Sequence, residues 1–172
     1  MNVRSTGIDW QTCSIGADCE IWEPVNILGC KIGFGCRIAP FVEIQRYVVI
    51  GDRCNIGTGA FIAAGTQIAD EVFVGQGVRI CNCQYPRAVA VRGGQLKTPD
   101  EWALAPVRIA RGASIGSNST ILPGVVIGED AMIGAGSVVT TNVPKRAVFA
   151  GNPARLRAGG RGHTNATGEG TS

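Results

Sequence analysis

The chain has 172 residues, of which 45% are apolar, 17% charged and 6% aromatic, and its formal net charge is +3. This length and apolar content are those of one globular domain, and so small a charge does not by itself indicate nucleic acid as a partner. The 25 glycines and few aromatic residues favour many tight turns over a large aromatic core.

The first sixteen residues, MNVRSTGIDWQTCSIG, have no basic segment followed by an apolar run, which a signal peptide would need. No segment is apolar over the length needed to span a bilayer. We therefore expect a cytoplasmic protein that does not bind a membrane.

Aliphatic residues recur every six positions over most of the chain, with one step of five between Ile27 and Ile32. Residues 81–106 interrupt the recurrence, which then resumes. The positions are Ile15, Ile21, Ile27, Ile32, Ile38, Ile44, Ile50, Ile56, Ile62, Ile68, Val74 and Ile80, then Ile109, Ile115, Ile121, Ile127, Ile133 and Val139.

A small or β-branched residue lies two positions before each aliphatic residue. Residues two apart on a strand share one face, so each pair should point one large and one small side chain inward. Eighteen such six-residue units, three to a turn, predict an all-β parallel helix of about six coils. A sandwich or barrel with fortuitous spacing is the alternative.

The interruption at residues 81–106 predicts a long external loop, because so regular a repeat cannot hold extra residues inside its body. After the last coil, Val143-Pro144 should end strand pairing, and residues 147–155 should fold back as a short cap. We expect one domain over residues 1–157. The polar tail, residues 158–172, reads as disordered.

Five of the seven cysteines fall in the small inward position, where a thiol acts as a compact apolar group. These are Cys13, Cys19, Cys30, Cys36 and Cys54. Cys81 and Cys83 lie at the base of the loop. They lack partners for a metal site, because the single histidine, His163, is in the tail. We therefore expect no bound metal.

The repeat is the hexapeptide repeat, and over most of residues 10–157 the chain resembles the left-handed parallel β-helix acyltransferases. Proteins with this repeat have several functions, so the fold alone decides little. A carbonic-anhydrase-like member needs three histidine ligands for zinc, and this chain cannot supply them.

Transfer of an acyl group to a hydroxyl usually requires a general base such as histidine. A carboxylate such as Glu23 or Glu43 is a weak base unless it is desolvated. An amine is already nucleophilic near neutral pH, so positioning and fixed N–H donors supply most of what its attack requires. The lack of a histidine before the tail therefore favours N-acyl transfer over O-acyl transfer.

Four segments resemble the bacterial nucleotide-linked 3-amino-sugar N-acetyltransferases, and together the likeness extends over about nine-tenths of the chain. They are EPVNILGCKIG (23–33), PFVEIQRYVVIG (40–51), DEVFVGQGVRICNCQYPRA (70–88) and ASIGSNSTILPGVVIGEDAMIGAGSVVTTNVPKRAVFAGNPARL (113–156). The last segment is generic to hexapeptide acyltransferases, whereas the Asn-x-x-Tyr-Pro-Arg-Ala element at 82–88 is more specific.

The resemblance implies that Asn82 lies beside the acceptor amine and orients it, since an amide oxygen can accept an N–H bond. The alternative is that Asn82 only caps the base of the loop. Tyr85 and Arg87 would shape the acceptor pocket, with Arg87 facing the nucleotide phosphates. Equally, Tyr85-Pro86 would only anchor the loop by packing. The remaining residues expected on the substrate side are Glu23, Gln45, Gln76 and Cys83.

The chain departs from this family at positions that should face the sugar. Relatives commonly have Asn-Asp where this chain has Asn82-Cys83, and His where it has Gln76. They also tend to have Ser-His and Cys-Glu where this chain has Thr58-Gly59 and Ala63-Ala64. The acceptor is therefore expected to be a different amino sugar, one without a carboxylate.

The resemblance further implies acetyl-CoA as the acyl donor, with its pantetheine arm along the late coils near Ser119 and Ser137. These two serines would otherwise only fill the small inward position. Lys145, Arg146 and Arg155 are candidates for the CoA phosphates, the alternative being solvated surface charge. A single narrow solenoid buries little apolar surface per residue, and CoA needs a surface on each side. Both points indicate a homotrimer with sites between subunits.

The resulting prediction is acetyl-CoA-dependent N-acetylation of a nucleotide-linked amino sugar, with the 3-amino position favoured. The alternatives are O-acetylation, N-acylation of another small molecule such as an antibiotic precursor, and a non-catalytic hexapeptide module.

Overall fold

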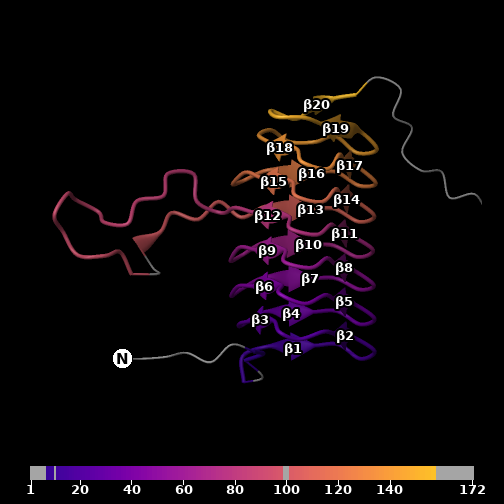
Figure 1. The fold of residues 1–172 in the computed structure, drawn as a ribbon, viewed down its shortest axis with the longest axis horizontal. Coiled ribbons are helices and arrows are strands. Elements are labelled where there is room, and N and C mark those ends of the chain that lie inside the picture. The colour runs from indigo at the N-terminus through magenta and orange to yellow at the C-terminus, as the bar shows by residue number, and fades with distance from the viewer. Residues whose placement is uncertain (1–6, 10, 99–100, 158–172) are drawn as a thin grey trace, which may run out of the picture.

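The computed structural model describes residues 7–9, 11–98 and 101–157. This part of the chain winds into a three-sided parallel β-helix whose strands stack in three sheets (Figure 1). Nearly all strands are two residues long, and from β1 to β19 consecutive strands belong to different sheets.

Sheet B comprises β1 (Ser14–Ile15), β4 (Lys31–Ile32), β7 (Val49–Ile50), β10 (Gln67–Ile68), β13 (Arg108–Ile109) and β16 (Val126–Ile127). Sheet C comprises β2 (Glu20–Ile21), β5 (Arg37–Ile38), β8 (Asn55–Ile56), β11 (Phe73–Val74), β14 (Ser114–Ile115), β17 (Met132–Ile133), β19 (Val148–Ala150) and β20 (Arg155–Leu156). Sheet A comprises β3 (Asn26–Ile27), β6 (Glu43–Ile44), β9 (Phe61–Ile62), β12 (Arg79–Ile80), β15 (Thr120–Ile121) and β18 (Val138–Val139).

The predicted inward pairs form the core. From Ile27 onward every predicted aliphatic residue is buried, and so is every predicted small residue from Val25 onward. Cys36 and Cys54 each place the thiol sulfur 3.1 Å from a main-chain oxygen, that of Gly51 and that of Ala69 respectively. The periodicity therefore predicted the core correctly.

The chain passes three corners in each coil, which we name by the sheets they join, in chain order B–C, C–A and A–B. Many corners contain a residue with positive φ, such as Arg53 at 54° and Tyr47 at 63° in place of glycine. Close stacking limits the residue beside some turns. A Cβ on Gly75 would lie 2.7 Å from the main-chain nitrogen of Ser117, too close for a side chain.

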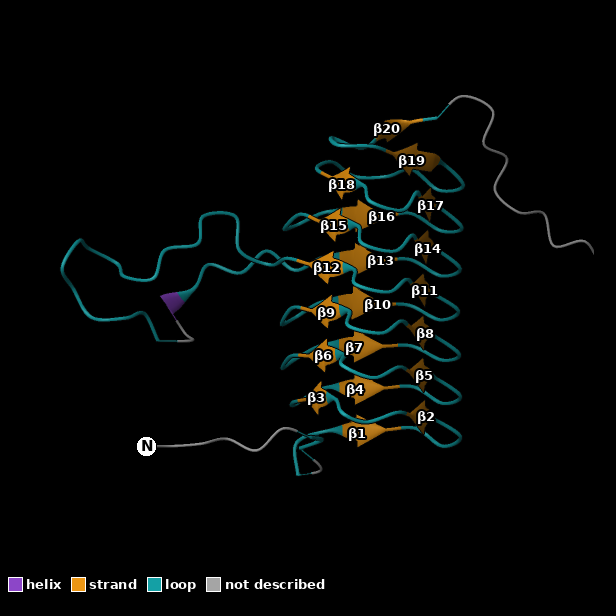
Figure 2. Ribbon diagram, viewed as in Figure 1, coloured by secondary structure: helices purple, strands orange, loops and turns teal. Residues whose placement is uncertain are grey.

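The long loop leaves at the A–B corner after β12 and returns before β13, as predicted. Across it the stacking register is kept, because Gln67 pairs with Arg108 as if the repeat were continuous. Two isolated bridges, Cys83–Leu104 and Val89–Leu96, join its two arms. The loop projects well away from the solenoid (Figure 2), and its apolar side chains Val91 and Leu96 are 69% and 76% exposed.

The C-terminal end corrects one prediction. Strand pairing does not stop at Val143-Pro144, because Val143 bridges to Ile127 and β19 pairs parallel with β17. At the other end Ile8 bridges to Ile27. These partial coils bring the six complete coils to about seven turns. The predicted cap is confirmed, since β20 folds back antiparallel to β19.

The predicted disordered tail, residues 158–172, lies outside the described residues. In the part of the chain that is described, no helix is both long and apolar enough to cross a membrane.

Candidate active site at the A–B corner

Asn82 lies at the base of the loop, two residues after β12. Its side-chain Nδ2 donates a hydrogen bond to the main-chain oxygen of Ala64, 3.0 Å away and one coil lower in the stack. A carbonyl oxygen can only accept, so this bond fixes which end of the amide faces the solenoid. The half-buried side chain therefore turns Oδ1 away from Ala64, and Oδ1 has no hydrogen-bond partner among the described residues.

Gln45 lies one coil below Ala64 at the same corner. Its Oε1 accepts a hydrogen bond from the Ala64 main-chain N–H at 3.1 Å, and its Nε2 donates to Glu43 Oε1 at 3.2 Å. Gln45 and Glu43 are both half-buried. The corner thus contains a column of hydrogen bonds that ends at Asn82.

The other predicted loop residues occupy the arm that follows Asn82. Cys83 is half-buried and forms the bridge to Leu104, whereas Tyr85 and Arg87 are exposed. Tyr85 is 75% exposed, so it does not anchor the loop by packing within one copy of the chain. Burial raises the pKa of the Cys81 thiol, which keeps that thiol protonated at neutral pH and unsuited to act as a nucleophile.

Glu23 and Gln76 lie at a different corner. Both are in C–A turns, at the opposite edge of sheet A from Asn82, and both are exposed. Gln76 Oε1 accepts a hydrogen bond from the Ser117 hydroxyl at 2.6 Å. The predicted substrate-side residues therefore divide between the two edges of sheet A and do not form one cluster in a single chain.

Sequence reasoning missed two groups near this face. One is the Ala64 main chain, which holds both Gln45 and Asn82. The other is Arg79, which is exposed on β12 and donates from Nη1 to the Gly59 carbonyl. The available signal was spacing: one uninterrupted coil is about 18 residues, so residues 64 and 82 stack.

Ser119 and Ser137 fill the small inward position and are fully buried. Both hydroxyls donate to the main-chain oxygen of Gly134. A cofactor on the outside of the coils would therefore meet the main chain here and not these side chains.

The three predicted basic residues are exposed near the C-terminal end of the stack. Arg146 Nε lies 3.8 Å from Asp130 Oδ2, with the Arg146 side chain 74% exposed. Arg155 donates to its neighbour's main-chain oxygen, that of Ala154, at 2.9 Å. Their positive charges remain accessible to an anionic ligand.

Comparison with known proteins agrees with this geometry. The family model described as bacterial transferase hexapeptide (six repeats) matches residues 29–64 and 106–141, on both sides of the loop. The matched residues show that the chain is a hexapeptide-repeat protein.

Its relatives include an amino-sugar N-acetyltransferase. A dTDP-3-amino-3,6-dideoxy-alpha-D-galactopyranose 3-N-acetyltransferase of Aneurinibacillus thermoaerophilus is 57% identical over 49 residues, 28% of this chain and 26% of the relative. The bifunctional protein GlmU of Carboxydothermus hydrogenoformans is 28% identical over 171 residues, 78% of this chain and 38% of the relative. The hexapeptide-repeat protein thus spans well under half the length of these relatives.

Solved structures share the fold. A variant of AntD, an N-acyltransferase from Bacillus cereus in complex with dTDP and coenzyme A, superposes with a TM-score of 0.72 at 22% identity, over 84% of this chain and 82% of that one. A variant of perosamine N-acetyltransferase from Caulobacter crescentus, with CoA and GDP-perosamine, gives 0.60 at 21% identity, over 84% and 58%.

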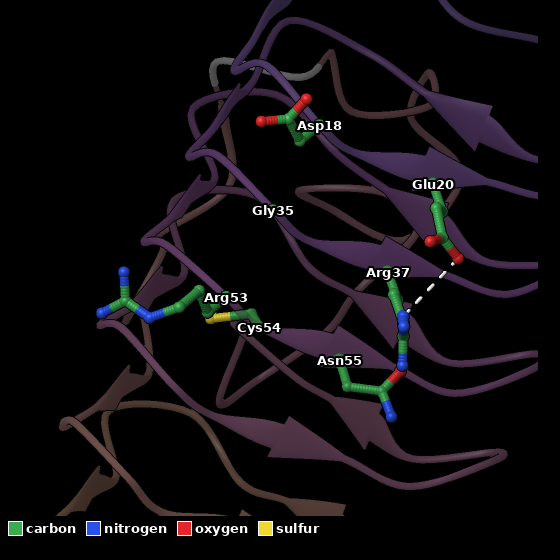
Figure 3. Close-up of a pocket in the computed structure, with 7 residues that line it drawn as sticks. All are labelled: Asp18, Glu20, Gly35, Arg37, Arg53, Cys54 and Asn55. Carbon is green, nitrogen blue, oxygen red and sulfur yellow. Dashed lines mark ion pairs between the residues drawn. The ribbon is translucent and has the colours of Figure 1, made fainter.

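The hexapeptide-repeat protein also has a hollow of about 290 Å³ on sheet C of the lower coils (Figure 3). Charged side chains line it, including Glu20 and Arg37, whose Oε2 and Nε atoms are 3.5 Å apart. More than half of each of these side chains is exposed, so the pair contributes little. None of the predicted site residues lines this hollow.

At the B–C corner the hexapeptide-repeat protein contains a ladder of ion pairs. Glu71 Oε1 lies 2.7 Å from Arg53 Nη2 and 2.9 Å from Arg111 Nη2. Hydrogen bonds from Arg111 and then Arg53 lower the pKa of the Glu71 carboxyl to about 2. In the same turns, Asp70 Oδ1 accepts a hydrogen bond from the Asp52 main-chain nitrogen, and Asp52 Oδ1 accepts one from the Phe34 main-chain nitrogen. Within the described part of the chain, no group of three or more His, Cys, Asp or Glu side chains is placed to hold a metal.

Proposed function

We propose that the protein transfers the acetyl group of acetyl-CoA to the amine of a nucleotide-linked amino sugar. The observation that carries this proposal is the Asn82 amide. Its nitrogen is held by Ala64, and its oxygen is left as an acceptor at the point where the loop begins. An acceptor fixed in this way can take one N–H of an amine and direct the nitrogen lone pair toward a thioester carbon.

The reaction needs no strong base. The amine nitrogen attacks the thioester carbon, the new C–N bond forms, and the C–S bond breaks as the tetrahedral intermediate collapses. The proton that the nitrogen loses ends on the CoA sulfur, directly or through water. No histidine lies in the described residues, since the single histidine is His163. A neutral amine supplies the nucleophile that a hydroxyl would provide only after deprotonation.

Acetyl-CoA fits the exposed basic groups at the C-terminal end. Lys145, Arg146 and Arg155 would contact its phosphates. The pantetheine arm would lie against main-chain groups of the late coils, where main-chain N–H groups would also receive the oxyanion of the tetrahedral intermediate. The relatives whose structures contain CoA support this choice of donor.

The acceptor would be bound by the loop. Arg87, exposed five residues after Asn82, would face the phosphates of the nucleotide, and Tyr85 and Cys83 would line the sugar. Glu23 and Gln76 lie across sheet A from these residues. They would join the same site only if a second copy supplied them, which supports a homotrimer with sites between subunits. The 3-amino position is proposed because one relative acts on a 3-amino sugar.

The test is a panel assay with the purified protein and acetyl-CoA, following release of the CoA thiol. The acceptors are 3-amino and 4-amino sugar nucleotides, the matching 3-hydroxy and 4-hydroxy compounds, and an aminoglycoside. We expect turnover of an amino sugar nucleotide and none of its hydroxy counterpart. Turnover of hydroxyl acceptors alone would show O-acetylation, and failure to bind CoA in calorimetry would show a non-catalytic module. Either result overturns the proposal.

A further inference from the structure

Four groups at the A–B corner form a continuous chain of hydrogen bonds that spans three coils. Asn82 Nδ2 donates to the Ala64 oxygen at 3.0 Å, and the Ala64 N–H donates to Gln45 Oε1 at 3.1 Å. Gln45 Nε2 then donates to Glu43 Oε1 at 3.2 Å. Each member donates to the next, and the chain ends on the Glu43 carboxylate.

The chemistry of the partners fixes both side-chain amides. The Ala64 main chain offers one donor and one acceptor, so it can face only the oxygen of Gln45 and only the nitrogen of Asn82. Glu43 accepts from the nitrogen that Gln45 has left. Neither amide can reverse without losing a bond, and bonds aligned in one direction polarise one another.

Within the described residues, the Ala64 N–H donates its hydrogen bond to the side-chain oxygen of Gln45. The two peptide groups that meet at the Ala64 Cα each have one further bond, because the Ala63 oxygen accepts from Thr66 Oγ1 and Gly65 N donates to the Arg46 oxygen. Gln45 binds the N–H of the Ala63–Ala64 peptide group and Asn82 binds the oxygen of the Ala64–Gly65 peptide group, so the two side chains are linked through the backbone of Ala64.

We propose that Gln45, held by Glu43, is a positioning residue that sets the orientation of the Asn82 amide. It acts through the Ala64 main chain and touches neither substrate nor cofactor. This replaces the expected role of Gln45 in direct substrate binding, and it rests on the proposed function, in which Asn82 orients the amine. Without Gln45 the Ala64 N–H loses its partner and the backbone torsions of Ala64 are less restrained. The Ala64 oxygen can then shift, and Asn82 samples rotamers that do not aim the amine.

The kinetic test is a double-mutant cycle between Gln45→Met and Asn82→Ala. Methionine keeps the length of the side chain and removes both hydrogen bonds. We expect Gln45→Met to lower kcat for the amine acceptor by about five- to ten-fold, with the KM for acetyl-CoA unchanged. In the Asn82→Ala background the same change should alter kcat by less than about two-fold, because coupled residues are not additive.

Gln67→Met is the matched control. Gln67 Nε2 donates to the Gly65 oxygen at 3.0 Å, close to the same corner, but Gln67 has no bond in the chain to Asn82. Its replacement should leave kcat unchanged. A loss of kcat from Gln45→Met that is equal in both backgrounds would show that Gln45 acts independently of Asn82, and no loss at all would show that it positions nothing. Either outcome overturns the inference.

The exchanged pair Glu43→Gln/Gln45→Glu serves as the rescue variant and remains usable if Gln45→Met does not fold. The new glutamine can donate to the new glutamate, which still accepts from Ala64, so both hydrogen bonds are kept. We expect kcat within about two-fold of the original protein. Gln45→Glu alone places two carboxylates together and should lower kcat. Loss of activity in the exchanged pair would contradict the inference.

A crystal structure of Gln45→Met separates this inference from the proposed function. We expect the bond between Asn82 Nδ2 and the Ala64 oxygen to be lost or the amide to occupy several rotamers, while Gln67→Met retains the bond. An unchanged Asn82 would overturn the positioning role even if the enzyme acetylates amines. A displaced Asn82 in a protein that acetylates no amine would leave the positioning role intact and refute the proposed function.

Discussion

The B–C and A–B corners are built from the same repeat but use their polar side chains differently. At the B–C corner Glu71 joins Arg53 to Arg111, so these charged groups satisfy one another. At the A–B corner the column of hydrogen bonds ends at an amide oxygen with no partner in the described chain. The three charged groups of this ladder are paired with one another, whereas the A–B corner has an acceptor available for a ligand.

This difference separates stability from chemistry. Changes at the B–C corner should alter the free energy of unfolding and leave turnover unaffected, because the ladder closes on itself. Changes at the upper part of the A–B corner should do the reverse, since a half-buried amide contributes little to folding and much to orientation.

Replacement of Asn82 by alanine should give the largest loss of activity. We expect kcat for the amine acceptor to fall about ten-fold or more, because the amine is no longer oriented against the thioester. The melting temperature should change little, since one hydrogen bond of a half-buried side chain is removed. Steady-state kinetics with thiol detection, together with calorimetric melting, measures both.

Asn55→Ala is the control for Asn82, because Asn55 is exposed on β8 of sheet C and lines the hollow away from the A–B corner. It should affect neither kcat nor melting. If Asn82→Ala lowers the melting temperature while kcat is unchanged, then Asn82 only caps the loop and the two corners do not differ in the way described.

The repeat let the sequence predict most of the fold. The six-residue recurrence of aliphatic residues predicted that Ile62, Ile80 and Ile109 lie in the core. The loop between Ile80 and Ile109 leaves the solenoid, and the strands before and after it keep their pairing register. Such positions are predictable because burial depends on local period alone. The ends of the solenoid were harder to predict. Val143 and β19 continue the pairing because a preceding coil offers them an edge, which the local pattern does not encode.

The site was predictable only in part. Asn82 at the base of the loop could be found from its motif, but its link to Gln45 depends on the stacking of residues from different coils. The burial of the Ser119 and Ser137 hydroxyls follows from the small inward position of the repeat, which the sequence offered as the alternative to a place beside the cofactor. The contact between Glu71 and Arg111 could not be found from the coil length alone. The two residues stack on each other although Arg111 lies 40 residues further along the chain, because the external loop lies between them.

Lys145 and Arg146 lie in the last turn of the B–C corner, at the C-terminal end of the stack. Replacing them shows whether this corner has a role in binding as well as in stability. If they bind the CoA phosphates, the double replacement Lys145→Ala/Arg146→Ala should raise the KM for acetyl-CoA by about three- to ten-fold with kcat little changed. Calorimetric titration with CoA should weaken in parallel.

Lys31→Ala is the control for this pair, since Lys31 is exposed on β4 near the other end of the stack. It should leave the KM for acetyl-CoA unchanged. A fall in melting temperature with no effect on CoA binding would instead make Arg146 part of the ladder, through its contact with Asp130.

Glu71→Gln should give the smallest effect, confined to stability and dependent on pH. The folded protein holds the pKa of Glu71 at about 2, below its ordinary value of 4.5. The carboxylate therefore stabilises the fold fully above pH 4.5, and this contribution is lost as the pH falls through about 2. The melting temperature of Glu71→Gln should be lower than that of the original protein at pH 7, and the two should converge toward pH 2.

Glu129→Gln, at the next step of the same corner, should show no such convergence, because the Glu129 side chain forms no ion pair in the described chain. A drop in kcat for Glu71→Gln at pH 7 would place chemistry at the B–C corner and remove the contrast between the two corners.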